Sequence, residues 1–178
     1  MGEKLKEYLK YFVGFAIICY FILTLVCKSN KFFDNLDISI TITLFVSFLY
    51  IEYLWKYNPF EKTPKIYGKY EAIVSSTYDT KRRKIYITIK QNLISTRIYI
   101  NTKESNSESI SSDLIKKQDY WQLIYTYENI PDAQERNHSE IHYGTCRLKI
   151  IDKFIVSGEY YTDRNTTGTI KKIKKLNN

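Results

Sequence analysis

Two long apolar runs fill most of the first third of the chain, and a short polar segment separates them. The first run, residues 11–27, contains no charged residue, and the second covers residues 38–55. Strongly apolar side chains each favour membrane insertion by roughly 0.3 to 0.6 kcal/mol at mid-membrane. At a rise of about 1.5 Å per residue, each run covers most of the ~30 Å hydrocarbon core as a helix. The pattern therefore predicts two transmembrane helices.

The second run begins with a pattern that also occurs in strands. Residues 38–43 alternate Ile with Ser or Thr at period two, which is typical of a half-buried strand. The apolar run then continues to Ile51, which is too long for one strand, so we interpret it as a helix. Its only charge, Glu52, lies beside Tyr53 and Trp55, an arrangement typical of an interfacial aromatic belt.

Small polar side chains recur every fourth residue along the second run, at Ser39, Thr43 and Ser47. Such a stripe lets membrane helices approach closely and hydrogen-bond to each other. Two interpretations follow. The stripe is either an assembly surface between copies of the chain or a contact within one helical hairpin.

The flanks of the two runs predict how they are oriented. The first run lacks a small-residue cleavage site of the A-x-A kind, so we expect it to be retained. Lysines are more frequent outside the pair of runs than between them, and an excess of positive charge marks the cytoplasmic side. The outer six are Lys4, Lys6, Lys10, Lys56, Lys62 and Lys65, and the inner two are Lys28 and Lys31. We therefore expect a two-pass protein whose N-terminus and following domain are cytoplasmic.

After residue 63 the pattern changes to short runs of β-branched and aromatic residues separated by polar turns. Pro59 and Pro64 stop any helix from continuing across this boundary. Eight candidate strands follow, at residues 66–75, 84–91, 95–102, 109–116, 120–128, 141–151, 154–162 and 168–174. They predict a small all-β antiparallel barrel over residues 64–178, behind a membrane anchor at residues 1–63, because closure of an up-and-down barrel leaves no exposed strand edge.

The net charge of +8 is concentrated in the predicted barrel, where residues 64–178 hold twenty Lys and Arg and thirteen Asp and Glu. A basic domain attracts phosphates, nucleic acid or an anionic membrane surface, and a solvated basic surface without a ligand is the simpler alternative. An eight-stranded barrel has room for packed side chains and one small ligand. The charge alone leaves the partner open.

The barrel sequence contains no motif of a known catalytic centre. A phosphate-binding glycine loop, a nucleophile elbow and a Cys-x-x-Cys metal motif are all missing from it. His138, His142 and Cys146 recur every fourth residue, but on a strand such positions lie roughly 13 Å apart, too far to share one ion. We therefore predict that the protein is not an enzyme and holds neither a metal nor a cofactor.

Residues suited to nucleotide binding occur on several of the predicted strands. Aromatic rings can stack on bases, and hydroxyl and guanidinium groups can donate to phosphates. The Ser-rich segment 104–109 is also compatible with a simple solvated turn, and each tyrosine alone with core or rim packing. The candidates are Thr102, Ser105, Ser107, Tyr125, Tyr127, Asn129, His142, Tyr160, Tyr161, Thr162 and Arg164.

Four segments, in a fixed order behind the two-helix anchor, carry a resemblance to a known family. They are Gln91 with residues 102–109 (TKESNSES), residues 123–131 (LIYTYENIP), residues 142–145 (HYGT), and residues 158–164 (GEYYTDR) with Gly168. Over essentially its whole length the chain resembles the SMODS-associated two-transmembrane, β-strand-rich effectors of bacterial CBASS anti-phage systems.

This resemblance implies a function that composition does not show. In this family a nucleotidyltransferase activated by phage infection makes a cyclic oligonucleotide, and the barrel of the effector binds it. The effector chains then assemble through their membrane helices and disrupt the membrane, which kills the infected cell. Under this resemblance the stripe at Ser39, Thr43 and Ser47 is an assembly surface rather than a hairpin contact. The resemblance therefore implies a cyclic dinucleotide ligand, a homo-oligomer on activation, a functional link to the nucleotidyltransferase and a location in the bacterial inner membrane.

For the site, we expect Arg164 to contact a phosphate and Tyr161 or Tyr127 to stack on a base. The expected hydroxyl donors are Thr102, Ser105 or Ser107. The residues alone leave two other functions open. One is a membrane-tethered barrel that binds a lipid or fatty acid, and the other is a partner-docking barrel without a small ligand, whose basic surface meets anionic headgroups.

Overall fold

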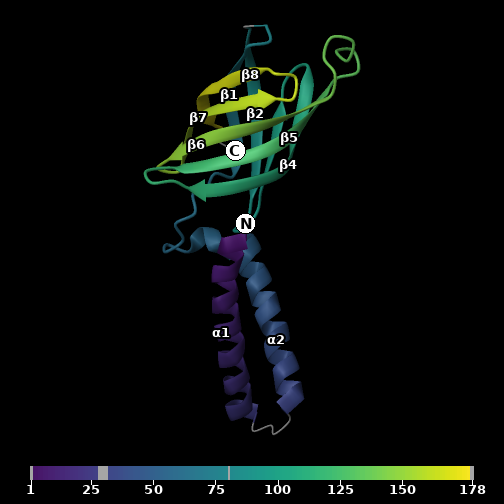
Figure 1. Ribbon diagram of the computed structural model, residues 1–178. Coiled ribbons are helices and arrows are strands. Elements are labelled where there is room, and N and C mark those ends of the chain that lie inside the picture. The colour runs from purple at the N-terminus through teal and green to yellow at the C-terminus, as the bar shows by residue number, and fades with distance from the viewer. Residues whose placement is uncertain (1, 28–31, 80, 177–178) are drawn as a thin grey trace. The chain divides into compact units, whose positions relative to one another are not determined.

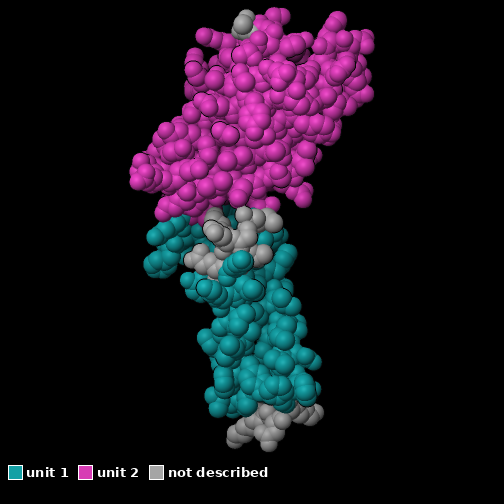
Figure 2. Space-filling view, in the orientation of Figure 1, with its two compact units in different colours: residues 1–62, 92–94 teal, residues 63–91, 95–178 magenta. Residues whose placement is uncertain are grey.

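A computed structural model describes residues 2–27, 32–79 and 81–176 of the chain. It divides into two compact units, Met1–Lys62 with Asn92–Ile94, and Thr63–Gln91 with Ser95–Asn178 (Figure 2). The first is helical and the second is a closed eight-stranded antiparallel barrel (Figure 1). The predicted fold class is confirmed. Lys28 and Lys31, used in the prediction of orientation, lie outside the described residues.

The helical unit contains two long apolar helices, α1 (Gly2–Cys27) and α2 (Phe32–Leu49). A π-helical turn, Tyr50–Leu54, and a 3-10 turn, Trp55–Tyr57, continue α2. The segments Tyr8–Val26 and Phe32–Tyr57 are long and apolar enough to cross a membrane. The helical segment ends at Tyr57, and the extended backbone of Asn58 (φ −70°, ψ 117°) is the conformation favoured before a proline.

The small polar stripe of α2 lies inside the helical hairpin. Ser39, Thr43 and Ser47 are all buried, as is Asn35 one turn earlier. The Asn35 amide donates to Thr24 Oγ1 on α1 (3.3 Å), while the Ser39 and Thr43 hydroxyls donate to backbone carbonyls one turn earlier in α2. Within one chain the stripe therefore forms the hairpin contact, and its predicted role in assembly between chains remains a prediction.

The barrel pairs each strand with its sequence neighbour, and β1 closes it against β8. Its strands are β1 (Gly68–Ser76), β2 (Arg82–Gln91), β3 (Thr96–Asn101), β4 (Ser105–Lys116), β5 (Trp121–Pro131), β6 (His142–Ile151), β7 (Phe154–Thr162) and β8 (Thr167–Lys175). The largest difference from the predicted bounds is at β4, which begins at Ser105. Most of the Ser-rich segment is therefore not a turn: Glu104 ends the preceding loop, and from Ser105 onward the chain pairs with β5. Within this strand Ser105 and Ser107 are less exposed than the residue between them.

The core of the barrel follows the period of two in its strands. Ile85, Ile87 and Ile89 of β2 are almost fully buried, and on the alternate face Tyr86 and Lys90 are exposed and Thr88 is half-buried. Leu148 on β6 is buried in the same way. The inward side chains from neighbouring strands form one continuous apolar cluster, which fills the interior at one end and leaves the other end to polar residues.

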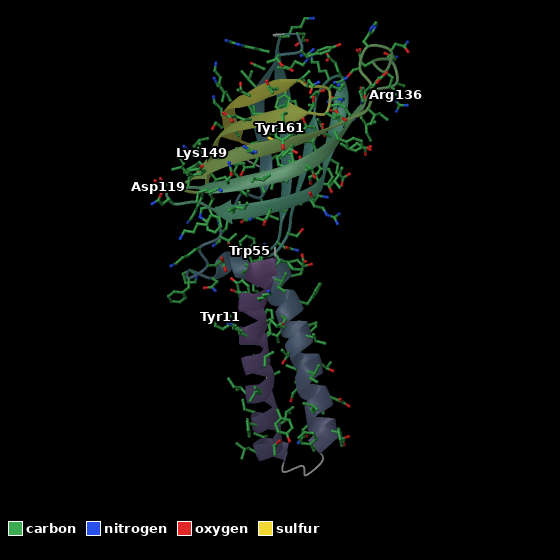
Figure 3. The ribbon with its side chains drawn as sticks, in the orientation of Figure 1. Tyr11, Trp55, Asp119, Arg136, Lys149 and Tyr161 are labelled. Carbon is green, nitrogen blue, oxygen red and sulfur yellow. The ribbon has the colours of Figure 1, made fainter. Side chains whose placement is uncertain are left out.

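The antiparallel order gives the barrel two distinct ends. We call one end the mouth; it carries the loops at residues 77–81, 102–104, 132–141 and 163–166. We call the other end the base; it carries the connections β2–β3, β4–β5 and β6–β7, and there the chain enters β1 and leaves β8. Figure 3 shows Arg136 in a mouth loop and Lys149 and Asp119 at the opposite end.

Candidate ligand-binding site

A cavity of about 490 Å³ opens at the mouth and is lined by side chains from all eight strands. Its most deeply buried lining residues are Ile85, Tyr125, Cys146 and Ile170. Toward the mouth the lining becomes polar, with hydroxyls, an amide, two imidazoles, three carboxylates, a lysine and two arginines. The cavity therefore combines an apolar interior with convergent polar groups, the usual composition of a small-molecule site.

Ten of the eleven predicted ligand residues line this one cavity: Thr102, Ser105, Ser107, Tyr125, Tyr127, Asn129, His142, Tyr160, Thr162 and Arg164. Tyr161 does not line it. Its neighbours Tyr160 and Thr162 point inward, so Tyr161 points outward, where its side chain is 49% exposed (Figure 3). There it borders a separate outer groove with Arg147, Glu159 and Thr167, among others.

The two arginines of the cavity differ in how firmly they are held. Arg83 donates to both carboxylate oxygens of Asp79 (2.9 Å from Nη1 to Oδ1) and through Nε to Glu104 (3.2 Å). The Asp79 hydrogen bond raises the pKa of Arg83 and, reciprocally, the Arg83 hydrogen bond lowers the pKa of Asp79. Arg83 is thus already neutralised by carboxylates, and it organises the loops of the mouth rather than offering free charge.

Arg164 has weaker partners. Its Nη1 lies 3.4 Å from Ser139 Oγ, its Nη2 lies 3.4 Å from His142 Nε2, and its guanidinium carbon lies 5.8 Å from the centre of the Tyr78 ring. Its Nε is buried and has no hydrogen-bond partner among the described residues. These neighbours are a hydroxyl, a neutral ring and an aromatic face, so this cation faces the cavity with donors to spare.

His142 lies at the inner edge of the mouth and is held as a neutral ring. Burial lowers its pKa, the carbonyl of Glu140 opposes that shift, and the charge of Arg164 adds to it. Its Nδ1 lies 3.0 Å from the Glu140 carbonyl oxygen. This geometry assigns the proton to Nδ1 and leaves Nε2 to accept from Arg164.

Lowering the pH should destabilise the unliganded barrel through His142. Its pKa in the folded chain is below the ordinary value of 6.5, so the unfolded chain binds this proton more readily. The contribution of His142 to the free energy of unfolding is therefore fully present above about pH 6.5, and it is lost as the pH drops toward the lowered pKa. We expect the melting temperature of the full chain to fall more between pH 7.5 and pH 5.5 than that of His142→Gln. Equal falls would contradict this assignment.

An aromatic wall lines the inner part of the cavity. The rings of Tyr125 and Tyr127 lie 6.0 Å apart at 51°, and burial raises the pKa of both phenols. Burial also raises the pKa of the Cys146 thiol to about 12. The Tyr127 ring packs over Gly144, where a Cβ atom would lie 2.5 Å from it. The wall is therefore neutral at physiological pH, and a glycine fixes its position.

The Tyr125 hydroxyl is buried without a hydrogen-bond partner of ordinary geometry among the described residues. The neighbouring Cys146 thiol is only a weak partner. Tyr125→Phe should therefore leave the free energy of unfolding of the unliganded chain unchanged or raise it by up to about 1 kcal/mol, yet weaken ligand binding about three- to tenfold. Tyr86→Phe, on the exposed outer face, is the matched control. A destabilised Tyr125→Phe chain with unchanged affinity would contradict this role.

The side-chain amide of Asn129 is oriented by a hydrogen bond within the cavity. Ser107 Oγ donates to Asn129 Oδ1 (2.8 Å), which turns the amide nitrogen of Asn129 away from Ser107. Thr102 has a different role. Its Oγ1 accepts hydrogen bonds from the backbone nitrogens of Ser105 (2.8 Å) and Glu104 (3.0 Å), and these bonds stabilise the mouth loop. Of the three predicted hydroxyl donors, Thr102 therefore shapes the loop, Ser107 orients an amide, and the Ser105 hydroxyl lies 3.2 Å from that of Thr102.

Several lining residues were not predicted from the sequence. Arg83 could have been found, since it is in phase with Ile85 and the other inward residues of β2. Tyr78 and His138 come from loops, where no periodic pattern indicates direction, and the Tyr78 hydroxyl donates to the His138 carbonyl (3.2 Å). Among the described residues no group of three or more His, Cys, Asp or Glu side chains is placed to hold a metal ion.

Comparison with known proteins relates this cavity to a ligand class. The sequence model of the "Cap15, cyclic dinucleotide receptor domain" matches residues 61–174, which include the whole wall of the cavity. The chain belongs to the Cap15 family. The predicted resemblance to CBASS effectors is thereby confirmed, and the ligand class in the family's description agrees with the predicted cyclic dinucleotide.

Two Cap15 relatives extend the match beyond the barrel. A protein named CD-NTase-associated protein 15 from Staphylococcus schleiferi is 30% identical over 184 residues, covering 99% of this chain and all of the relative. A protein of the same name from Escherichia albertii is 23% identical over 192 residues, covering 99% of both chains. Both relatives therefore align with the helical segment as well as with the Cap15 barrel.

Proposed function

We propose that this Cap15 protein is a membrane-anchored receptor without catalytic activity, which binds a cyclic dinucleotide in the mouth cavity and then disrupts the bacterial inner membrane. The N-terminus and the barrel lie in the cytoplasm, where a nucleotidyltransferase supplies the ligand. The chain assembles into a homo-oligomer through its membrane helices. Assembly and membrane damage end in the death of the infected cell.

One observation carries the proposal: the cavity holds a buried guanidinium nitrogen and a buried phenol that lack ordinary partners among the described residues of the unliganded chain. An unsatisfied buried polar group costs about 1–3 kcal/mol, and a ligand that pairs it recovers that cost. Arg164 is suited to a phosphate, because guanidinium groups bind phosphate oxygens with paired donors. Tyr127 offers a face for a base, and the Asn129 amide offers donors for its edge.

The membrane helices connect ligand binding to membrane damage. Apolar side chains on both helices are exposed within this single chain, among them Phe21 (59%) and Phe45 (62%). In a bilayer these faces meet lipid or another copy of the chain. Ligand binding favours the assembled state only as far as the assembled barrel binds the ligand more tightly than the single one does.

A lipid-binding barrel is the second candidate, and the lining of the cavity argues against it. A fatty acid needs a long apolar channel, whereas this cavity places Arg164, Asn129 and His142 around its opening. The apolar lining residues, such as Ile85 and Ile170, are confined to the inner part of the barrel.

Thermal unfolding of the full chain in detergent micelles distinguishes the two candidates. A cyclic dinucleotide at a hundred times its dissociation constant adds about 2.7 kcal/mol to the free energy of unfolding, which raises the melting temperature by about 8 °C or more for a domain of this size. Fatty acids should produce no comparable shift. A shift with fatty acids, and none with any member of a cyclic dinucleotide panel, would overturn the proposal.

A further inference from the structure

The charges of the barrel are distributed unequally between its two ends. The base, defined as residues 64–69, 90–91, 95–97, 113–121, 149–154 and 174–176, holds ten Lys and Arg and three Asp. The mouth, defined as residues 76–84, 101–108, 128–142 and 159–167, holds seven Lys and Arg and nine Asp and Glu. The base is thus +7 and the mouth −2, so the excess positive charge of the barrel gathers at the end opposite the cavity.

These cations are presented to solvent. Nine of the ten side chains are exposed, and we call them the base patch: Lys69, Lys90, Arg97, Lys116, Lys117, Lys149, Lys153, Lys174 and Lys175. Several extend over aromatic rings, such as Lys149 over Tyr120 (4.8 Å) and Lys175 over Tyr67 (5.1 Å). Lysines whose stems lie along aromatic surface, with the ammonium group in water, are typical of membrane interfaces.

Apolar side chains are exposed among these cations. The β6–β7 turn at Asp152 and Lys153 has two positive φ angles (48° and 71°), as in the tight type I′ hairpin. The turn pairs Ile151 with Phe154, and the two side chains are 37% and 71% exposed. The hairpin therefore presents a small rigid apolar tip beside Lys149 and Lys153, a combination that suits the boundary between headgroups and acyl chains.

The connector between the helical segment and the barrel is short. Ten residues separate Tyr57, the last residue of the helical segment, from Gly68, the first of β1. Such a connector spans at most about 35 Å. This connector enters β1 at the base, so the base is the end of the barrel that is tied to the helical segment by the shortest stretch of chain. Near a membrane surface, anionic headgroups raise the affinity by about a factor of five for each basic residue.

We infer that the base patch binds anionic phospholipid headgroups of the membrane that carries the helices. This inference rests on the membrane anchoring proposed above but not on ligand binding. Nucleic acid also binds positively charged surfaces. An exposed apolar hairpin tip and a short connection to membrane helices, however, favour binding to lipid and contribute nothing to binding of nucleic acid. Binding by the base leaves the mouth, at the other end, open to cyclic dinucleotides from the aqueous phase.

Hydrogen–deuterium exchange of the full chain in lipid nanodiscs tests this inference. One disc contains phosphatidylcholine alone, and in the other a third of the lipid is phosphatidylglycerol. We expect the phosphatidylglycerol disc to slow exchange in the hairpins at residues 116–121 and 149–154 by about fivefold. The difference should vanish at about 0.5 M salt. Equal exchange in the two discs would overturn the inference, as would protection of these hairpins by RNA in place of lipid.

Two matched triple variants locate the effect. Lys116→Glu, Lys117→Glu and Lys153→Glu together should abolish the lipid difference, while Arg82→Glu, Lys103→Glu and Arg136→Glu, equally exposed at the mouth, should retain it. Loss of the difference in the mouth variant would contradict the assignment to the base. A matching set of Lys→Arg changes keeps the positive charge and should retain the lipid difference, so its loss in that set would indicate misfolding instead of lost charge. Elution of the chain with the discs reports anchoring, so failure of anchoring is distinguishable from failure of lipid recognition.

Discussion

Arg164→Ala should weaken binding of a cyclic dinucleotide to the full chain by about 10- to 100-fold, because a charge-assisted hydrogen bond to a buried site contributes about 1.5–3 kcal/mol. The fold should tolerate this change. The side chain makes only long hydrogen bonds to Ser139 and His142, lies over the Tyr78 ring, and leaves its Nε without a partner among the described residues, so its removal costs little in the unliganded chain. Isothermal titration of the purified chain measures the affinity.

Two control variants separate the role of Arg164 from a general effect of charge. Arg136→Ala removes an exposed cation from a mouth loop, at a position that does not line the cavity, and its affinity should stay within about twofold of the unmodified chain. Arg164→Lys keeps the charge but loses the paired donors, so its affinity should fall between the two. Undiminished binding by Arg164→Ala would contradict the phosphate contact.

Replacing Ser39, Thr43 and Ser47 together with leucine should abolish the toxicity of the activated protein while leaving ligand affinity within about twofold. The three positions are 1%, 6% and 8% exposed inside the hairpin. Each leucine overfills a packed contact at a cost of about 1–3 kcal/mol, so the two helices must separate or change register. We expect more cells that make the ligand to survive, measured as colony counts.

A matched pair of single variants tests the same point. Thr43 is buried in the hairpin, whereas Thr41 is exposed on the same helix, so Thr43→Leu should reduce toxicity and Thr41→Leu should not. If Thr41→Leu reduced toxicity and Thr43→Leu did not, the exposed face of the helix, and not the hairpin contact, would be the surface needed for toxicity. If the triple variant kept full toxicity, the helices would be an anchor and not the part that damages the membrane.

The period of two along the strands predicts most of the cavity wall from the sequence alone. It places Tyr125, Tyr127 and Asn129 on one face of β5, and all three line the cavity. The same rule shows why Tyr161 does not, because the residue between two inward side chains must point outward. Composition identifies rings and hydroxyls suited to a nucleotide, but only the phase of each strand determines which of them share one interior.

Other features depend on contacts that no local pattern encodes. Tyr78 and His138 reach the mouth from loops that lie sixty residues apart in the chain. The neutralisation of Arg83 requires Asp79 and Glu104 from two different connections. The stripe of small polar residues on α2 is visible in the sequence, but its burial against α1 depends on how two helices pack, which the pattern leaves open between two alternatives.

Binding of a cyclic dinucleotide in the mouth cavity is tested most directly by a crystal structure of the full chain grown with a saturating concentration of this ligand. We predict ligand density inside the cavity, with a phosphate within hydrogen-bond distance of the Arg164 guanidinium and a base against the Tyr127 ring. Density in the outer groove beside Tyr161, or a mouth cavity that stays empty of ligand, would contradict this prediction.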